Sequence, residues 1–385
     1  MRRNIFLMNL AAAFLWMGMY SYAPVLPAYA ASIGANIVMI GIIGGSYGIM
    51  QIILRIPLGI VADKLNKDHL ILIVGFAVLT LSTVLFIFAE GVYMLIFARA
   101  VAGAAAAWWV VVCVSFSKYY PENEQVKAQG KVSASANMGK VIAAVLCAVV
   151  AQFISYQATF ILAFVIAAVG LVMMFGLKDQ KAQQEKPASV KEQLALLKNR
   201  ELLSFSILAL LSQMLCFAIP TTFAAVAAEE LGADGLQLGL LTAVYFLFTS
   251  LFSLFVGTKL YKKMGGQHVL AISFLIGAFS CMPVFYHSSL VQIFIMQALS
   301  GISYGITIAA LGGFAIRSVP VHQRGAATGI FQSIFGVGIF LGPVVTGFTI
   351  DGVSSDAAYW LMFILMLVAA ALCYVLVPKR YHGMT

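Results

Sequence analysis

The stretch MQIILRIPLGIVADKLNKDHL, residues 50–70, is mainly apolar until Asp63, after which Lys64 and Lys67 follow. One arginine, Arg55, interrupts the apolar part. An apolar helix of about 20 residues is long enough to cross the hydrocarbon core of a bilayer, which is about 30 Å thick. The stretch therefore indicates the end of a membrane span and the polar loop that follows it.

The composition extends this interpretation to the whole chain. Hydrophobic residues make up 62% of it and charged residues 10%, and the mean hydropathy is +0.99, which is far from the balance of a soluble domain. Long apolar runs without strict alternation indicate helices and not a membrane barrel. We predict an all-α integral membrane protein with twelve spans, near residues 5–30, 37–62, 70–89, 92–116, 132–152, 157–177, 202–228, 237–260, 268–286, 290–315, 326–350 and 357–377.

Positive charge predicts the orientation. Of the 23 lysines and arginines, all but Arg55, Arg99 and Lys140 fall in the terminal segments and in loops on one side of the predicted spans. Cytoplasmic loops of membrane proteins are enriched in these residues. We therefore expect a multi-pass plasma membrane protein, of bacterial cytoplasmic type, with both termini cytoplasmic. The net charge of +9 follows from these loops and does not indicate nucleic-acid binding.

The chain also divides into two similar halves. A polar stretch over 177–200 is the expected cytoplasmic linker between a six-helix bundle at 1–176 and a second one at 201–385. The sequence SIGAN at 32–36 corresponds to ELGAD at 230–234, and RAVAG at 99–103 corresponds to QALSG at 297–301, both at an offset of 198 residues. A shared offset indicates two bundles related by an axis along the membrane normal.

With this topology, the loop sequence GIVADKLNK at 59–67 resembles the signature of the major facilitator superfamily, G-x-x-x-D-[RK]-x-G-[RK]. Gly59, Asp63, Lys64 and Lys67 match it, and Asn66 replaces the usual glycine. The resemblance implies a secondary transporter that moves a small-molecule substrate by alternating access. It also implies that the four matching residues form a conformational latch, and we expect Asp63 to end the second helix.

Two further motifs leave drug efflux open as an alternative. Arg99-x-x-x-Gly103 and GIFLGPVVTG at 338–347 are similar to motifs of drug–proton antiporters. The second motif normally lies on helix five, which here reads NMGKVIAAV at 137–145 and has no proline. The alternative function is therefore a proton-coupled multidrug efflux antiporter for lipophilic compounds.

Arg55, Arg99 and Lys140 are predicted to lie near mid-membrane, each about 12–14 Å from a span end by helical rise, and no carboxylate is predicted at that depth. A central Arg or Lys costs about 2.5–3.5 kcal/mol to insert. We expect the three cations to bind an anionic group of the substrate. Alternatively, the arginines brace helices, or Lys140 carries coupling protons.

Other polar and aromatic residues at this depth complete the predicted substrate site. In the N-terminal half they are Trp16, Tyr20, Gln51 and Asn137, and in the C-terminal half Tyr245, Gln297, Tyr304 and Gln332. Trp108 is a further candidate for contact with an apolar part of the substrate. The leading prediction is a transporter of a small organic anion.

An enzyme is not predicted. G-x-S-x-G occurs at 44–48 and 301–305, but both matches lie within spans, and the five histidines are expected in loops or the tail, away from a serine nucleophile. The five cysteines fall in spans without paired spacing, so we expect no disulfide, metal site or cofactor. Expected partners are the bilayer and a small-molecule substrate, with protons or a counter-anion as coupling partners, and we expect a monomer.

Overall fold

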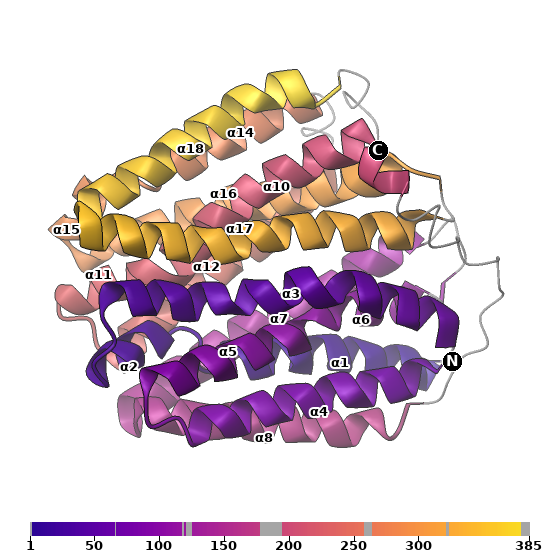
Figure 1. Ribbon diagram of the computed structural model, residues 1–385, viewed down its shortest axis with the longest axis horizontal. Helices are drawn as coiled ribbons and strands as arrows, with labels where there is room; N and C mark the ends of the chain where they lie inside the picture. The colour runs from indigo at the N-terminus through magenta and orange to yellow at the C-terminus, as the bar shows by residue number, and fades with distance from the viewer. Residues whose placement is uncertain are drawn as a thin grey trace.

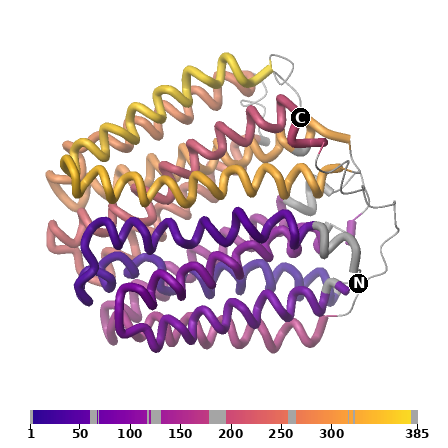
Figure 2. Tube along the Cα trace, in the orientation of Figure 1, coloured from indigo at the N-terminus to yellow at the C-terminus, as the bar shows by residue number. Residues whose placement is uncertain are grey.

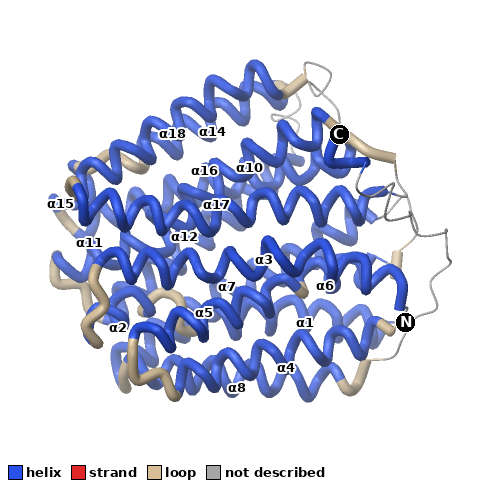
Figure 3. The backbone as a smooth tube through the Cα atoms, in the orientation of Figure 1, coloured by secondary structure: helices blue, strands red, loops and turns tan. Residues whose placement is uncertain are grey.

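The computed structural model of the protein describes residues 2–65, 67–117, 119–120, 125–177, 195–257, 264–320 and 323–378. Within these ranges the secondary structure is helical throughout, and the long helices run side by side along one direction (Figures 1 and 3). Eleven helical segments of the described chain are long and apolar enough to cross a membrane. This agrees with the predicted all-α membrane fold.

The first half consists of α1 to α8 and the second half of α10 to α18, and the halves lie against each other as two bundles (Figure 2). The N-terminal helices are α1 (Arg2–Tyr20), α2 (Leu26–Ser32), α3 (Ile37–Leu65), α4 (Asp68–Ile87), α5 (Val92–Ala107), α6 (Trp109–Ser117), α7 (Gln125–Phe153) and α8 (Tyr156–Met174). Most of the predicted linker, residues 178–194, lies outside the described ranges, so the domain boundary stays a prediction.

The second bundle follows a short 3₁₀ turn at Leu196–Lys198. Its helices are α10 (Arg200–Ala218), α11 (Ala224–Glu230), α12 (Gly235–Ser253), α14 (Gly266–Phe279), α15 (Val284–Ser288), α16 (Leu290–Arg317), α17 (Arg324–Gly352) and α18 (Ser355–Leu376). A π-helical segment, Ile219–Phe223, joins α10 to α11, and a 3₁₀ turn, Leu254–Gly257, follows α12. Side-chain caps start several of these helices: Ser289 and Ser354 each accept a backbone N–H three residues on.

The two halves repeat each other element by element at the offset seen in the sequence. Adding 198 to the bounds of α2, Leu26–Ser32, gives those of α11, Ala224–Glu230. The starts of α3 and α12, of α4 and α14, and of α5 and α16 are related in the same way. The helix boundaries therefore confirm the predicted repeat, and eleven of the twelve predicted spans correspond to candidate membrane helices in the described chain.

Two glycines explain why the RAVAG and QALSG segments match. A Cβ placed on Gly103 would lie 2.2 Å from the carbonyl oxygen of Tyr47, and one on Gly301 would lie 2.4 Å from that of Tyr245. Tyr47 and Tyr245 are themselves 198 residues apart. Each bundle thus needs a glycine where α5 approaches α3, or α16 approaches α12, backbone to backbone.

Close packing also joins the two bundles. Helix α3 lies along α17, where a Cβ on Gly41 would be 2.5 Å from the Pro343 carbonyl oxygen and one on Gly48 would be 2.6 Å from the Phe340 nitrogen. Helix α12 lies along α7, where a Cβ on Gly239 would be 2.4 Å from that of Ala148. Gly41 and Gly239 are each the fifth residue of their helices, close to the end of the molecule that carries α2, α11 and α15, which we call the far end (Figure 1), whereas Gly48 lies closer to the middle of α3.

The other end, where the chain starts and where α18 finishes, is called the terminal end (Figure 1). Here a Cβ on Gly325 or Gly329 of α17 would meet nothing within 4 Å. The helices α3 and α17 thus pack closely toward the far end, whereas Gly325 and Gly329 make no close packing contact.

Several local predictions were wrong. The predicted span 5–30 is not one continuous helix, because the chain turns over residues 21–25, next to Pro24, between α1 and α2. The predicted span 202–228 lies within one helical segment, Arg200–Glu230, which is π-helical over Ile219–Phe223. Helix α3 continues past Asp63 to Leu65. His69, His268 and His287 lie within the ends of α4, α14 and α15 instead of in loops, and His322 and His382 are outside the described residues.

Candidate substrate site

Arg55 links the two bundles. Its side chain is 2% exposed, and one terminal nitrogen donates to the backbone carbonyl of Gln332 on α17 at 2.8 Å. The other terminal nitrogen donates to Oε1 of Gln51, one turn earlier on α3. The guanidinium also lies 4.8 Å from the centroid of the Phe335 ring. These contacts favour the alternative in which Arg55 braces helices.

Arg99 is held inside the N-terminal bundle. Its guanidinium carbon lies 4.3 Å from the centroid of the Tyr47 ring and 5.8 Å from that of Tyr22. A terminal nitrogen donates to the Tyr22 hydroxyl at 3.3 Å. The side chain is 7% exposed, so two tyrosines of its own bundle surround most of the charge.

Lys140 has a different environment. Its ammonium nitrogen lies 4.1 Å from the centroid of the Trp16 ring, 5.6 Å from that of Tyr20 and 5.2 Å from that of Phe246. Within the described residues no hydrogen-bond acceptor and no carboxylate contacts this nitrogen. We call Lys140, Trp16, Tyr20 and Phe246 the Lys140 cluster.

The position of Lys140 follows from the residue before it. A Cβ on Gly139 would lie 2.5 Å from the carbonyl oxygen of Ala13, so α7 approaches α1 closely at this point. Trp16 is one helical turn after Ala13 and therefore lies on the same face of α1. The close approach at Gly139 thus brings the Lys140 side chain over the indole ring.

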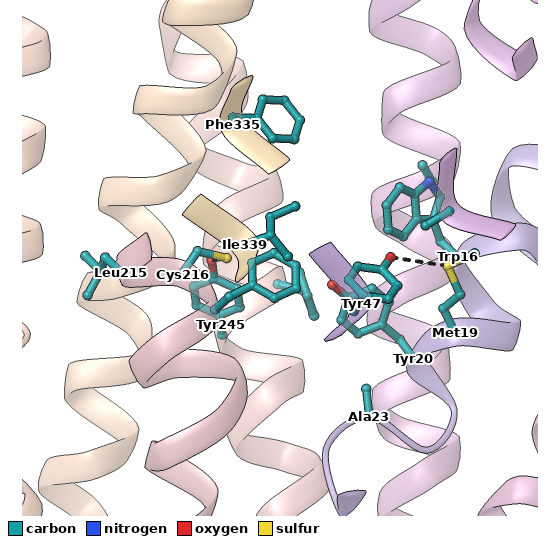
Figure 4. Close-up of a cluster of buried hydrophobic side chains, with 14 of the residues drawn as sticks. Trp16, Met19, Tyr20, Ala23, Tyr47, Leu215, Cys216, Tyr245, Phe335 and Ile339 are labelled. Carbon is teal, nitrogen blue, oxygen red and sulfur yellow. Dashed lines mark hydrogen bonds between the residues drawn. The ribbon is translucent and has the colours of Figure 1, made fainter. Parts of the chain in front are cut away.

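The Lys140 cluster spans the interface between the bundles. Tyr20 from α1 and Phe246 from α12 form an edge-to-face pair with centroids 4.7 Å apart. Figure 4 shows the surrounding buried side chains, with Trp16, Tyr20 and Tyr47 on one side and Cys216 and Tyr245 on the other. A ligand at Lys140 would therefore contact both halves of the molecule.

The predicted polar residues of the C-terminal bundle form mainly internal contacts. The Tyr245 hydroxyl donates to the Cys216 sulfur at 2.8 Å, Gln297 donates to the Pro220 carbonyl at 2.9 Å, and the Tyr304 hydroxyl accepts from Gln213 at 3.1 Å. The side-chain oxygens of Gln213, Gln297 and Gln332 are buried without a hydrogen-bond partner in the described chain. They are acceptors available to a ligand or to a rearranged bundle.

Some site residues were missed by sequence reasoning. Phe246, Phe335 and Tyr22 contact the three cations, but no pattern in the sequence singles them out among 28 phenylalanines and 15 tyrosines. Trp108 donates to the Ile71 carbonyl at 2.7 Å instead of facing the substrate site. Its neighbour Trp109 is the residue that contacts Trp16, edge to face, at 5.6 Å between centroids.

The other predicted residues are placed as follows. Asn137 is partly buried, one turn before Lys140 on α7. In the predicted latch, Gly59 is partly buried, with Val110 3.7 Å from a Cβ built on it, and Lys67 is exposed. The side chains of Asp63 and Lys64 lie outside the described residues, so the latch stays a prediction. In the described chain, the five cysteines are buried and form no disulfide with one another, and no group of metal-binding side chains occurs.

The family model for the Major Facilitator Superfamily matches residues 8–227 and 203–384 of this chain. The protein belongs to this superfamily. An MFS-type transporter of Methanocaldococcus jannaschii, itself uncharacterised, is 23% identical, and the alignment covers 98% of this chain and 99% of the relative. The quinolone resistance protein NorA of Staphylococcus aureus is 20% identical, with 100% and 98% covered.

Solved structures of superfamily transporters share the fold. The human organic anion transporter MFSD10 superposes with a TM-score of 0.70 at 14% sequence identity, covering 97% of this chain and 99% of that one. At this identity the likeness concerns the fold alone. The superfamily consists of membrane transporters that bind small molecules, which agrees with the predicted transporter and with the absence of a predicted catalytic site.

Proposed function

We propose that this major facilitator transporter carries a small organic anion by alternating access and binds its anionic group at Lys140. The observation that carries the proposal is the Lys140 ammonium, which lies near mid-span among three aromatic rings and has no anionic partner in the described chain. A cation near mid-membrane without a carboxylate partner is costly. An anionic substrate would supply the missing partner.

The location of the Lys140 cluster supports alternating access at this site. Lys140, Trp16 and Tyr20 belong to the N-terminal bundle, and Phe246 belongs to the C-terminal bundle. A substrate between them would contact two bodies that move relative to each other in the transport cycle. The substrate could therefore favour one arrangement of the bundles by its differential contacts.

The remaining predictions extend this proposal. We assign the terminal end to the cytoplasm, with the protein in the plasma membrane, and Gly59, Asp63, Lys64 and Lys67 to the latch on that side. We expect a monomer that uses protons or a counter-anion for coupling. We assign Arg55 and Arg99 to bracing the helices around the site and not to binding the anion.

Drug efflux remains the second candidate, because NorA, named for quinolone resistance, is related over the whole chain. The aromatic rings of the Lys140 cluster would also suit a lipophilic compound. A cationic drug, however, would have to approach these rings while a lysine ammonium lies 4.1 Å from the nearest ring centroid. Repulsion between like charges in a medium of low dielectric opposes such binding.

A thermal-shift screen of the detergent-purified protein tests the proposal. The panels are carboxylates, phosphate esters and cationic lipophiles, matched in size. The variants are Lys140→Gln and, as a control on the same helix, Lys131→Gln. Lys131 is also near an aromatic ring, 5.0 Å from the Tyr120 centroid, but it is exposed.

We expect anions to stabilise the wild type and Lys131→Gln but not Lys140→Gln. Hits are then assayed by counterflow in proteoliposomes, where Lys140→Gln should lower uptake at least about tenfold, because it removes a charge-assisted contact of about 1.5–3 kcal/mol. Stabilisation by cationic or neutral lipophiles alone, unchanged in Lys140→Gln, would contradict the proposal and favour drug efflux.

A further inference from the structure

The Lys140 cluster contains a second donor without an acceptor. Trp16 is 8% exposed, and its indole Nε1 is buried with no hydrogen-bond partner in the described chain. This nitrogen belongs to the ring whose centroid lies 4.1 Å from the Lys140 ammonium. Two neighbouring donors, one charged and one neutral, therefore lack acceptors in the same part of the site.

The number of free donors favours one class of anion. A carboxylate has two oxygens, which an ammonium and an indole N–H can both contact. A phosphate ester carries more charge and more acceptor oxygens, and it is commonly bound by several cationic groups. In this structure Arg55 already donates to Gln332 and Gln51, and Arg99 donates to Tyr22.

The aromatic side chains of the cluster suit a ligand that carries an aromatic ring. Trp16 and Tyr20 lie with centroids 6.0 Å apart and planes tilted by 35°, while Phe246 meets Tyr20 edge to face and Trp109 meets Trp16 edge to face. A flat aromatic ring can join such a group through further offset or edge-to-face contacts. A saturated ring of the same size buries apolar surface but cannot form these aromatic contacts.

We infer that the transported anion is an aromatic carboxylate, whose carboxylate accepts hydrogen bonds from Lys140 and Trp16 and whose ring packs among Trp16, Tyr20 and Phe246. The inference rests on the proposed function, since it specifies the ligand of the same site. It adds the choice of carboxylate over phosphate, the requirement for a ring, and a specific contribution of the Trp16 N–H.

The test is isothermal titration calorimetry on the detergent-purified full chain, with ligands matched in shape. Benzoate is compared with cyclohexanecarboxylate, and 2-naphthoate with decahydro-2-naphthoate, so that each pair keeps the charge and changes the ring. Benzamide keeps the ring and removes the charge, and phenyl phosphate changes the anion. The variants are Lys140→Gln, Trp16→Phe, which keeps a ring but loses the N–H, and Lys131→Gln as control.

We expect each aromatic acid to bind about tenfold more tightly than its saturated partner, because several aromatic contacts of about 0.5–1.5 kcal/mol are gained. Benzamide and phenyl phosphate should bind at least about tenfold more weakly than benzoate. Trp16→Phe should weaken benzoate by about threefold to tenfold, and Lys140→Gln should weaken it further. Lys131→Gln should match the wild type.

The outcomes separate this inference from the proposed function. Equal binding of aromatic and saturated acids, with dependence on Lys140, would overturn the ring requirement while the anion transporter stands. Tighter binding of phenyl phosphate would overturn the carboxylate. If no acid binds, the inference is wrong, and if a cationic lipophile such as tetraphenylphosphonium binds instead, the proposed function is wrong as well.

Discussion

Among single residues, Arg99 provides the sharpest test of which cations support the fold. Its guanidinium lies over Tyr47 and donates to Tyr22, both in the N-terminal bundle. Lysine keeps the charge but lacks the planar group that stacks and the geometry that reaches the hydroxyl. We expect Arg99→Lys to lower the free energy of unfolding by about 1–3 kcal/mol, measured by denaturant titration in detergent.

Tyr22→Phe is the matched control for Arg99→Lys. It removes only the hydroxyl that accepts from Arg99 and should reproduce part of the loss, about 1 kcal/mol. Binding of carboxylates should be unchanged in both variants. If Arg99→Lys abolished binding without changing stability, Arg99 would be a substrate ligand and not a bracing residue.

The sequence predicted the candidate cations better than their partners. Arg55, Arg99 and Lys140 stand out because permanent or strong cations are rare at mid-membrane depth. Phe246 could not be found in this way, since its contact with Lys140 crosses between bundles and depends on tertiary packing. The sequence named Trp108 but not Trp109, and the contact of Trp109 with Trp16 depends on the break between α5, which ends at Ala107, and α6, which starts at Trp109.

At the scale of the helices, the repeated glycines determine how closely pairs within a bundle approach. A Cβ on Gly301 would lie 2.4 Å from the carbonyl oxygen of Tyr245, whereas a Cβ on Gly312 of the same helix would meet nothing within 4 Å. We expect Gly301→Ala to lower the free energy of unfolding by about 1–3 kcal/mol, because α16 must move away from α12.

Gly312→Ala should instead be neutral or stabilising by up to about 1 kcal/mol, since alanine favours the helix. Thermal unfolding of both variants in the same detergent measures the difference. Equal effects of the two substitutions would mean that the close approach of α16 and α12 does not contribute to stability.

Helix breaks were harder to predict than helix repeats. The offset of 198 residues predicted which elements correspond, and the bounds of α2 and α11 follow it. The break before α2 and the π-helical segment before α11 were missed, because hydropathy stays high across both while Pro24 and Pro220 remove backbone donors. Apolar content predicts that a segment crosses the membrane, but it does not predict whether its helix is continuous.

For the whole molecule, the contact between α3 and α17 should report the arrangement of the bundles. A Cβ on Gly48 would lie 2.6 Å from the Phe340 nitrogen and 2.9 Å from the Gly336 carbonyl oxygen, across the interface near the middle of the two helices. This contact differs from that of Gly301, because it joins the two bundles, which would separate in the proposed alternating-access cycle. An added methyl group should therefore be accommodated by separation of the bundles.

We expect Gly48→Ala to open the far end, with a loss of stability smaller than that of Gly301→Ala. Spin labels are attached at Ala35, before α3, and at Asp351, at the end of α17, in a background without native cysteines. Double electron–electron resonance then measures the distance between the two labels. The distance distribution should gain a longer component in Gly48→Ala and stay unchanged in Gly329→Ala, whose Cβ meets nothing within 4 Å. An unchanged distribution with a large loss of stability would instead make this contact part of a fixed core, and transport would require the bundles to separate elsewhere.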